Sequence, residues 1–126
     1  MKALIKSGPR PGLSLVEKPI PELTADGVRV QVMATSICGT DLHIYNWDAW
    51  AASKVTTPLT VGHEFCGEVL EVGPKVTRFQ PGDLVAAESH AFCDKCRPCR
   101  TGQRHICENE QIIGVQRDGA FAEQIV

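Results

Sequence analysis

Residues 93–107 read CDKCRPCRTGQRHIC, and this stretch carries four of the six cysteines in the 126-residue chain. Two residues separate Cys93 from Cys96 and Cys96 from Cys99, and Cys107 closes the series. A structural zinc takes four tetrahedral ligands, and two-residue gaps let a tight turn present successive thiolates to one ion. Because no coordination position is left open, the spacing predicts a structural zinc site rather than a catalytic one.

Other chemistry also fits four close cysteines. An iron–sulfur cluster takes four thiolates, and free or disulfide-bonded thiols are the simpler alternative. In a reducing compartment close cysteine spacing favours a metal over disulfides. Four thiolates on one Zn²⁺ leave a net negative charge. The basic residues of the loop either offset this charge or are ordinary solvated side chains: Lys95, Arg97, Arg100 and Arg104.

Short β-strands flank this loop. Val28, Val30 and Val32 alternate with polar residues and lie on one face of the clearest strand. Frequent Gly and Pro residues separate the strands, and little helical periodicity is present, so an irregular β-barrel of the mainly β class is expected. The predicted strands cover residues 1–6, 13–17, 27–35, 64–72, 84–87 and 119–126.

Few helices are expected. Thr40 or Asp41 is a plausible N-cap for a short helix that runs to about Trp47. Residues 48–58 are expected to form a loop or a second helical turn.

The composition bounds the class of protein. Apolar residues make up 43% and charged residues 22%, which is usual for one folded domain. A net charge of −2 without a basic run argues against a nucleic-acid partner. No apolar stretch is long enough for a signal peptide or a membrane span, so a cytoplasmic location is expected. A Gly-rich dinucleotide fingerprint is also missing.

Cys38, His63 and Glu64 are a second set of residues that can bind zinc, and a catalytic zinc commonly takes three protein ligands. Spacing alone does not join Cys38 to His63. A lone cysteine after a strand is more often a small buried residue, and Cys66 is expected to be one.

Four motifs together identify a family. Gly62-His63-Glu64-x2-Gly67-x5-Gly73-x2-Val76 resembles the signature of the zinc-containing medium-chain alcohol dehydrogenases. The segment 38–43, CGTDLH, resembles the first ligand segment of that family, and GDLV at 82–85 and the cysteine loop follow in the family's order. The resemblance covers nearly the whole chain. It implies a GroES-like fold.

The resemblance also implies site residues. Cys38, His63 and Glu64 would hold the catalytic zinc, although Glu64 can either bind the metal or lie behind it. Thr40 and His43 would relay the proton of the substrate hydroxyl. A further ligand of family members lies beyond residue 126, so this site is expected to hold zinc weakly.

The segment 43–50, HIYNWDAW, is most similar to family members that oxidise L-threonine with NAD, and His90 lies where they carry a histidine that influences the substrate. We therefore expect residues 1–126 to be a GroES-like catalytic domain with a zinc lobe at about 90–110. The NAD-binding Rossmann domain is absent from these residues. The full-length protein is expected to be a homotetramer, and the chain alone an inactive monomer without membrane or nucleic-acid partners.

Three alternatives remain open at this point. The chain could belong to a dehydrogenase of another alcohol or polyol. It could be a non-catalytic zinc-ribbon-like binding module, which the clustered cysteines support. It could also be a structural barrel like the ring co-chaperonin, since fold alone does not give function. The structural-barrel alternative leaves Cys38, His63 and the cysteine loop without a purpose.

Overall fold

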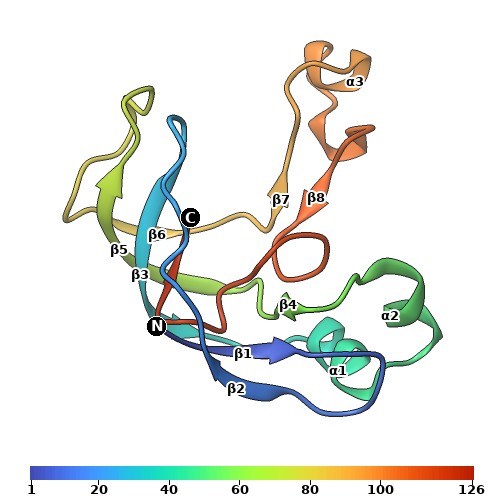
Figure 1. Ribbon diagram of the computed structural model, residues 1–126. Coiled ribbons are helices and arrows are strands. Elements are labelled where there is room, and N and C mark those ends of the chain that lie inside the picture. Colours follow the sequence, from blue (N-terminus) through green and yellow to red (C-terminus); the bar gives the residue numbers. More distant parts are fainter.

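The computed structural model describes residues 1–126 and is mainly β, with a few short helices, as the sequence predicts (Figure 1). None of the helices has the length and apolar character that a membrane span requires. The elements in chain order are β1 (Lys2–Lys6), β2 (Ser14–Glu17), β3 (Val28–Thr35), α1 (Gly39–Asn46), α2 (Ala49–Lys54), β4 (Leu59–Thr60), β5 (Phe65–Val72), β6 (Leu84–Ala86), β7 (His90–Ala91), α3 (Arg97–Arg100), a 3-10 helix (Arg104–Ile106), β8 (Gln111–Ile112) and β9 (Gln124–Ile125).

The strands form three antiparallel sheets rather than one closed ring of strands. Their orders are β6-β5-β3-β9, β2-β1-β4 and β7-β8. The segment before β9 joins the two larger sheets: Ala122 forms a bridge with Ala3, and the amide of Leu4 donates to the carbonyl of Phe121 over 2.7 Å. The barrel is therefore irregular and open.

The β3–β5 pair consists of the two longest strands and forms the centre of the larger sheet. Val30 is buried and packs with Ala120 and Ile125, while Val28 and Val32 pack beside it, which confirms the predicted apolar face. Gly67 on β5 lets the two strands approach, because a Cβ at this position would lie 2.1 Å from the carbonyl oxygen of Gln31. At the far end of the pair Thr35 lies opposite Phe65.

Helix α1 begins one turn after β3 and is capped differently from the prediction. Cys38, not Thr40 or Asp41, is the N-cap residue. Asp41 occupies the third helical position, where its Oδ2 accepts a hydrogen bond from the Cys38 amide over 2.8 Å. Such a capping box satisfies a free amide at the helix start. The helix ends at Trp47, in the left-handed region with φ 56°.

Two other predictions are wrong in detail. The expected strand over 119–126 is regular only in β9, because Ala120 and Phe121 instead donate their amides to the carbonyls of Gly62 and Val61. Cys66 is exposed rather than buried, since the alternation of β5 places its neighbours Gly67 and Val69 inward. The second helical turn expected within 48–58 is confirmed as α2.

Lys6 is fully buried, although its side chain has no acidic partner. Its Nζ donates to the carbonyls of Arg10, Gly12 and Tyr45 at 2.5, 3.2 and 2.9 Å. Tyr45 lies in the last turn of α1, where carbonyls are free and the helix dipole attracts a cation. Burial lowers the pKa of Lys6. The ammonium thus anchors α1 to the turn after β1.

Candidate metal centres and proton relay

Cys38, His63 and Glu64, here called the mixed cluster, meet at one end of the β3–β5 pair. Cys38 follows the end of β3, and His63 and Glu64 precede the start of β5. Because the strands run antiparallel, these two ends lie at the same edge of the sheet. One potential ligand atom from each of the three residues lies within 4.8 Å of the others.

Glycine packing fixes the backbone before His63. Gly62 has φ +92°, and a Cβ there would lie 2.2 Å from Cδ1 of Phe121. On its other side Gly114 and Gly119 lie so close that their own Cβ atoms would meet the Gly62 carbonyl oxygen at 2.5 and 2.1 Å. Only glycine suits this position, since it tolerates a positive φ and close backbone approach. Residues distant in sequence therefore fix the backbone from which the His63 side chain extends.

Asp41 connects two members of the mixed cluster. One of its oxygens caps the amide of Cys38, and the other, Oδ1, lies 3.7 Å from Nδ1 of His63. The two side chains are 4% and 10% exposed, and neither Asp41 Oδ1 nor His63 Nδ1 has a hydrogen-bond partner. A metal-binding histidine commonly gives its second N–H to a carboxylate. With Nδ1 toward Asp41, Nε2 is the nitrogen available to a metal.

Glu64 is held by the end of β3. The Ser36 hydroxyl donates to its Oε2, and the Thr35 hydroxyl donates to its carbonyl oxygen over 2.8 Å. These bonds leave Oε1 free. Sequence reasoning missed both Ser36 and Asp41 as supporting residues. The signal for Asp41 was its position three residues after Cys38, where a capping-box acid belongs.

The mixed cluster suits a zinc ion with an open coordination position. It offers a thiolate, an imidazole and a carboxylate, which is a donor set that zinc accepts. The position of Asp41 Oδ1 near His63 Nδ1 fits this assignment, because a metal-binding histidine commonly directs its second nitrogen toward a carboxylate.

Thr40 and His43 lie on the helix that starts at the mixed cluster. The Thr40 hydroxyl oxygen is 3.8 Å from Cys38 Sγ. His43 is one turn further along α1, and its side chain is 56% exposed. No hydrogen bond joins Thr40 directly to His43. The two groups can therefore carry a proton outward only with a further hydroxyl or water between them.

The cysteine loop (residues 93–107) forms a lobe that stands out from the sheets on the paired strands β7 and β8 (Figure 1). One sulfur from each of the four cysteines lies within 4.8 Å of the others, and Cys99 and Cys107 are buried. Cys107 Sγ is 3.5 Å from the sulfur of Cys93 and 3.9 Å from that of Cys96. Ligands at Zn–S distances of about 2.3 Å form tetrahedral edges of about 3.8 Å. The loop therefore has the dimensions of a zinc site.

Backbone amides, rather than arginines, face the sulfurs. Hydrogen bonds from the backbone amides of Lys95 and Cys96 lower the pKa of the Cys93 thiol to about 6. Burial raises the pKa of the Cys99 thiol to about 12. Arg104, one of the four basic residues considered for charge balance, forms its ion pair with Asp94 over 2.9 Å instead. Asn109 approaches two sulfurs, which sequence reasoning also missed.

His90 belongs to neither cluster. It lies on β7, and its Nδ1 is 2.6 Å from Glu88 Oε1. Hydrogen bonds from the side chain and the backbone of His90 lower the pKa of Glu88. The structure places this pair at the base of the cysteine lobe.

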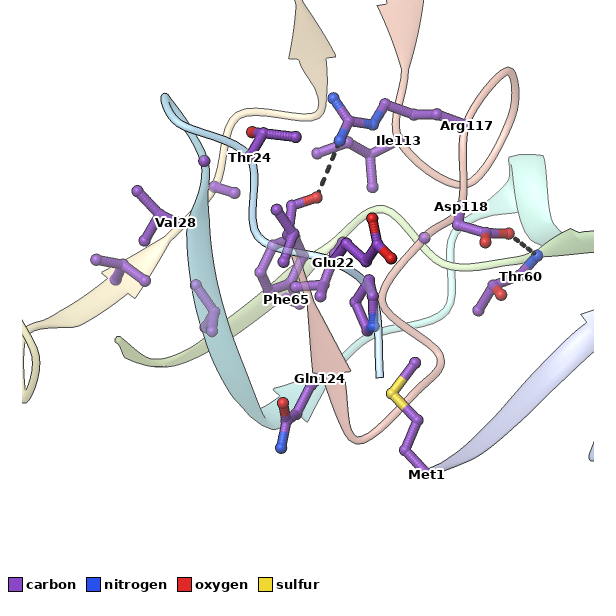
Figure 2. Close-up of a pocket in the computed structure, with 18 of the residues that line it drawn as sticks. Met1, Glu22, Thr24, Val28, Thr60, Phe65, Ile113, Arg117, Asp118 and Gln124 are labelled. Atoms are coloured by element: carbon purple, nitrogen blue, oxygen red, sulfur yellow. Dashed lines mark hydrogen bonds between the residues drawn. The ribbon is translucent and has the colours of Figure 1, made fainter. Parts of the chain in front are cut away.

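A large cavity of the chain does not contain the predicted chemistry. It is a groove of about 1030 Å³ lined in part by Glu22, Val28 and Ile125 (Figure 2). None of the mixed-cluster or cysteine-loop residues lines it. Two of its polar groups are already paired: Asp118 accepts from the Thr60 amide, and Arg117 donates to the last carbonyl of the chain. The candidate site is therefore assigned on donor chemistry rather than on cavity size.

Known proteins resemble this chain in sequence and in fold. The family model described as the alcohol dehydrogenase GroES-like domain matches residues 24–126. The L-threonine 3-dehydrogenase of Caldanaerobacter subterraneus subsp. tengcongensis is 55% identical over 99% of the chain, which spans 36% of that relative.

Solved structures agree. The alcohol dehydrogenase of Aeropyrum pernix has a TM-score of 0.89 at 30% identity, over 99% of this chain and 37% of its own. The cobalt- and zinc-bound alcohol dehydrogenase of Pyrobaculum aerophilum has a TM-score of 0.85 at 33% identity, over 99% and 38%. The chain thus spans little more than a third of the length of the proteins that it resembles.

Proposed function

The chain belongs to the alcohol dehydrogenase GroES-like domain family, and from this premise we propose that it is the catalytic part of an NAD-dependent zinc dehydrogenase. In the longer protein it oxidises the secondary alcohol of L-threonine to 2-amino-3-ketobutyrate. The observation that carries the proposal is the convergence of Cys38, His63 and Glu64 within 4.8 Å. The relative at 55% identity supports L-threonine as the substrate.

Each residue of the mixed cluster has a separate task in this proposal. Cys38, His63 and Glu64 hold the zinc, Asp41 orients His63, and Ser36 orients Glu64. A bound zinc acts as a Lewis acid that lowers the pKa of a coordinated hydroxyl.

The proton then has to leave the site. The Thr40 hydroxyl lies beside Cys38 Sγ and can accept the substrate proton while it passes its own onward. His43 receives the proton at the exposed end of the relay, because imidazole exchanges protons near neutral pH. We place His90 on the substrate side, where Oε1 of Glu88 holds its Nδ1.

The cysteine loop has a structural task in the proposal. Four sulfurs at tetrahedral spacing leave no open position, so a second zinc there stabilises the lobe rather than the reaction. NAD binding is assigned to other parts of the longer protein, since these residues contain no dinucleotide fingerprint. All six cysteines are free, which supports a cytoplasmic setting.

The test is NAD reduction by the natural protein that carries this chain. L-threonine should give the highest kcat/KM among L-threonine, butane-2,3-diol, sorbitol and a sugar-alcohol phosphate, and Cys38→Ser should abolish turnover. A preference for a polyol would replace threonine but keep the dehydrogenase. No zinc-dependent turnover with any alcohol would refute the proposal. The 126-residue chain alone is expected to be inactive.

A further inference from the structure

The relay residue His43 is held from one side by helix α2. Its Nδ1 contacts Oδ2 of Asp48, and its ring packs against Trp50 with centroids 5.7 Å apart and planes at 51°. Asp48 is the only charged side chain that the structure pairs with His43. An exposed histidine on an eight-residue helix would otherwise sample several rotamers.

Asp48 is itself fixed in place. It is the N-cap of α2, and its Oδ1 accepts the Ala51 amide over 3.0 Å. The bond from Ala51 and the bond from His43 lower the pKa of Asp48. One carboxylate oxygen therefore belongs to the helix cap, and the other is left for the imidazole.

We propose that Asp48 is a positioning residue for His43. By accepting the proton-bearing Nδ1, it holds the ring in one tautomer and leaves Nε2 as the nitrogen that takes the relayed proton. A carboxylate on one imidazole nitrogen fixes the role of the other in this way. The inference about the orientation of His43 rests on its contacts with Asp48 and Trp50. Only the kinetic consequence of that orientation rests on the proposed function.

Two substitutions separate the contact from the cap. Asp48→Ser keeps an N-cap oxygen but is too short to reach His43. Asp48→Asn keeps the capping oxygen toward Ala51 and presents its NH₂ group to Nδ1, which must then become an acceptor. Asp48→Ala loses both the cap and the contact, and it reports the cost of the missing cap. The melting temperatures of the Ser and Asn variants should match that of the wild type.

The first measurement is the ¹⁵N spectrum of the His43 ring. In the wild type the proton should reside on Nδ1. In Asp48→Asn it should move to Nε2, and Asp48→Ser should give a mixture. An unchanged tautomer in both variants would overturn the proposal, whatever reaction the protein catalyses.

The second measurement is the pH profile of kcat with L-threonine in the natural protein. The plateau should fall roughly 5- to 10-fold in Asp48→Ser, a loss near the lower limit for an orienting partner because both side chains are partly exposed. In a His43→Gln background Asp48→Ser should cause no further loss. An equal loss there would mean that Asp48 acts elsewhere, which would overturn the proposal. A wild type without turnover would refute the proposed function and leave the ¹⁵N result to decide this one.

Discussion

The cysteine loop and the mixed cluster bring metal-binding side chains together by opposite routes. The loop takes all its sulfurs from one segment of fifteen residues between the paired strands β7 and β8. The mixed cluster takes its members from the two ends of the β3–β5 pair, and it depends on a glycine packed against Phe121. A local site can therefore form with little help from the rest of the fold, whereas the mixed cluster requires it.

The two regions also differ in how they support their ligands. In the loop, amide N–H groups of the same segment face the sulfurs. In the mixed cluster, the side chains of Asp41 and Ser36 hold the ligands. The loop also offers four ligands and the mixed cluster three, so we expect zinc to bind the loop tightly and the mixed cluster weakly.

Removing a ligand from each region gives the largest expected effect. Cys107→Ser should abolish the tightly held zinc, because structural zinc contributes on the order of 10 kcal/mol in small domains. Cys38→Ser should remove only the zinc that a mild chelator extracts. Native mass spectrometry of the two variants measures both. Cys66→Ser is the matched control, since this exposed cysteine belongs to neither region. Loss of both ions in either variant would mean that the regions are not independent.

Glycine substitutions test the dependence on the fold. Gly62→Ala should destabilise the chain by about 3 kcal/mol or more, since the new Cβ meets Phe121 and the backbone is strained. Gly102→Ala, in the cysteine loop, should cost only about 1 kcal/mol, because its φ is also positive but nothing lies within 4 Å. Urea unfolding measures both. Equal losses of stability in the two variants would show that the positive φ alone accounts for the cost, and that the packing of Gly62 against Phe121 adds nothing to it.

This contrast explains what the sequence could predict. The cysteine loop was recognisable from spacing because its geometry is local. The valines of β3 were equally clear, since period-two alternation survives in the structure. Cys38 and His63 could be joined only through resemblance to a family, because the register that brings them together is set by pairing between distant strands.

Other details depend on tertiary contacts for the same reason. The role of Asp41 depends on His63, and that of Asp48 depends on how α2 folds back on α1. Lys6 was indistinguishable from a solvated strand residue, because its three carbonyl partners come from a turn and from the end of a helix. Lys6 can be buried because these backbone carbonyls replace water as its hydrogen-bond acceptors.

Acid should destabilise the fold through Asp118, whose side chain accepts hydrogen bonds from the Thr60 amide and from Lys18. Burial alone would raise the pKa of Asp118, but bonds from Lys18 and Thr60 outweigh it, so the pKa is lowered. A lowered carboxyl pKa gives stability that is present above about pH 4 and is lost as the pH falls further. Between about pH 5 and pH 3 the free energy of unfolding of the metal-free chain should therefore decrease by about 1 kcal/mol less in Asp118→Asn than in the wild type. The difference is small because the carboxylate of Asp118 is more than half exposed. Asp26→Asn, an exposed acid without an ion pair, should leave the slope unchanged, and equal slopes for all three chains would contradict the role of Asp118.

The smallest expected effect lies at Asn109, two residues after the end of the cysteine loop. Asn109 donates its amide to Cys107 Sγ over 3.4 Å and its side chain to Cys93 Sγ over 3.6 Å. A partly exposed hydrogen bond to a thiolate stabilises by about 0.5–1 kcal/mol, so Asn109→Ala should release the tightly held zinc to a chelator roughly two- to fivefold faster. Thr101→Ala removes hydrogen bonds to Arg97 and Pro98 in the same loop but none to sulfur, and it should not change the release rate. If both variants released zinc equally fast, general loosening of the loop would explain the effect. If only Asn109→Ala did, the side chain would be a direct support of the thiolates, and the local region would depend, like the mixed cluster, on a residue outside its ligand set.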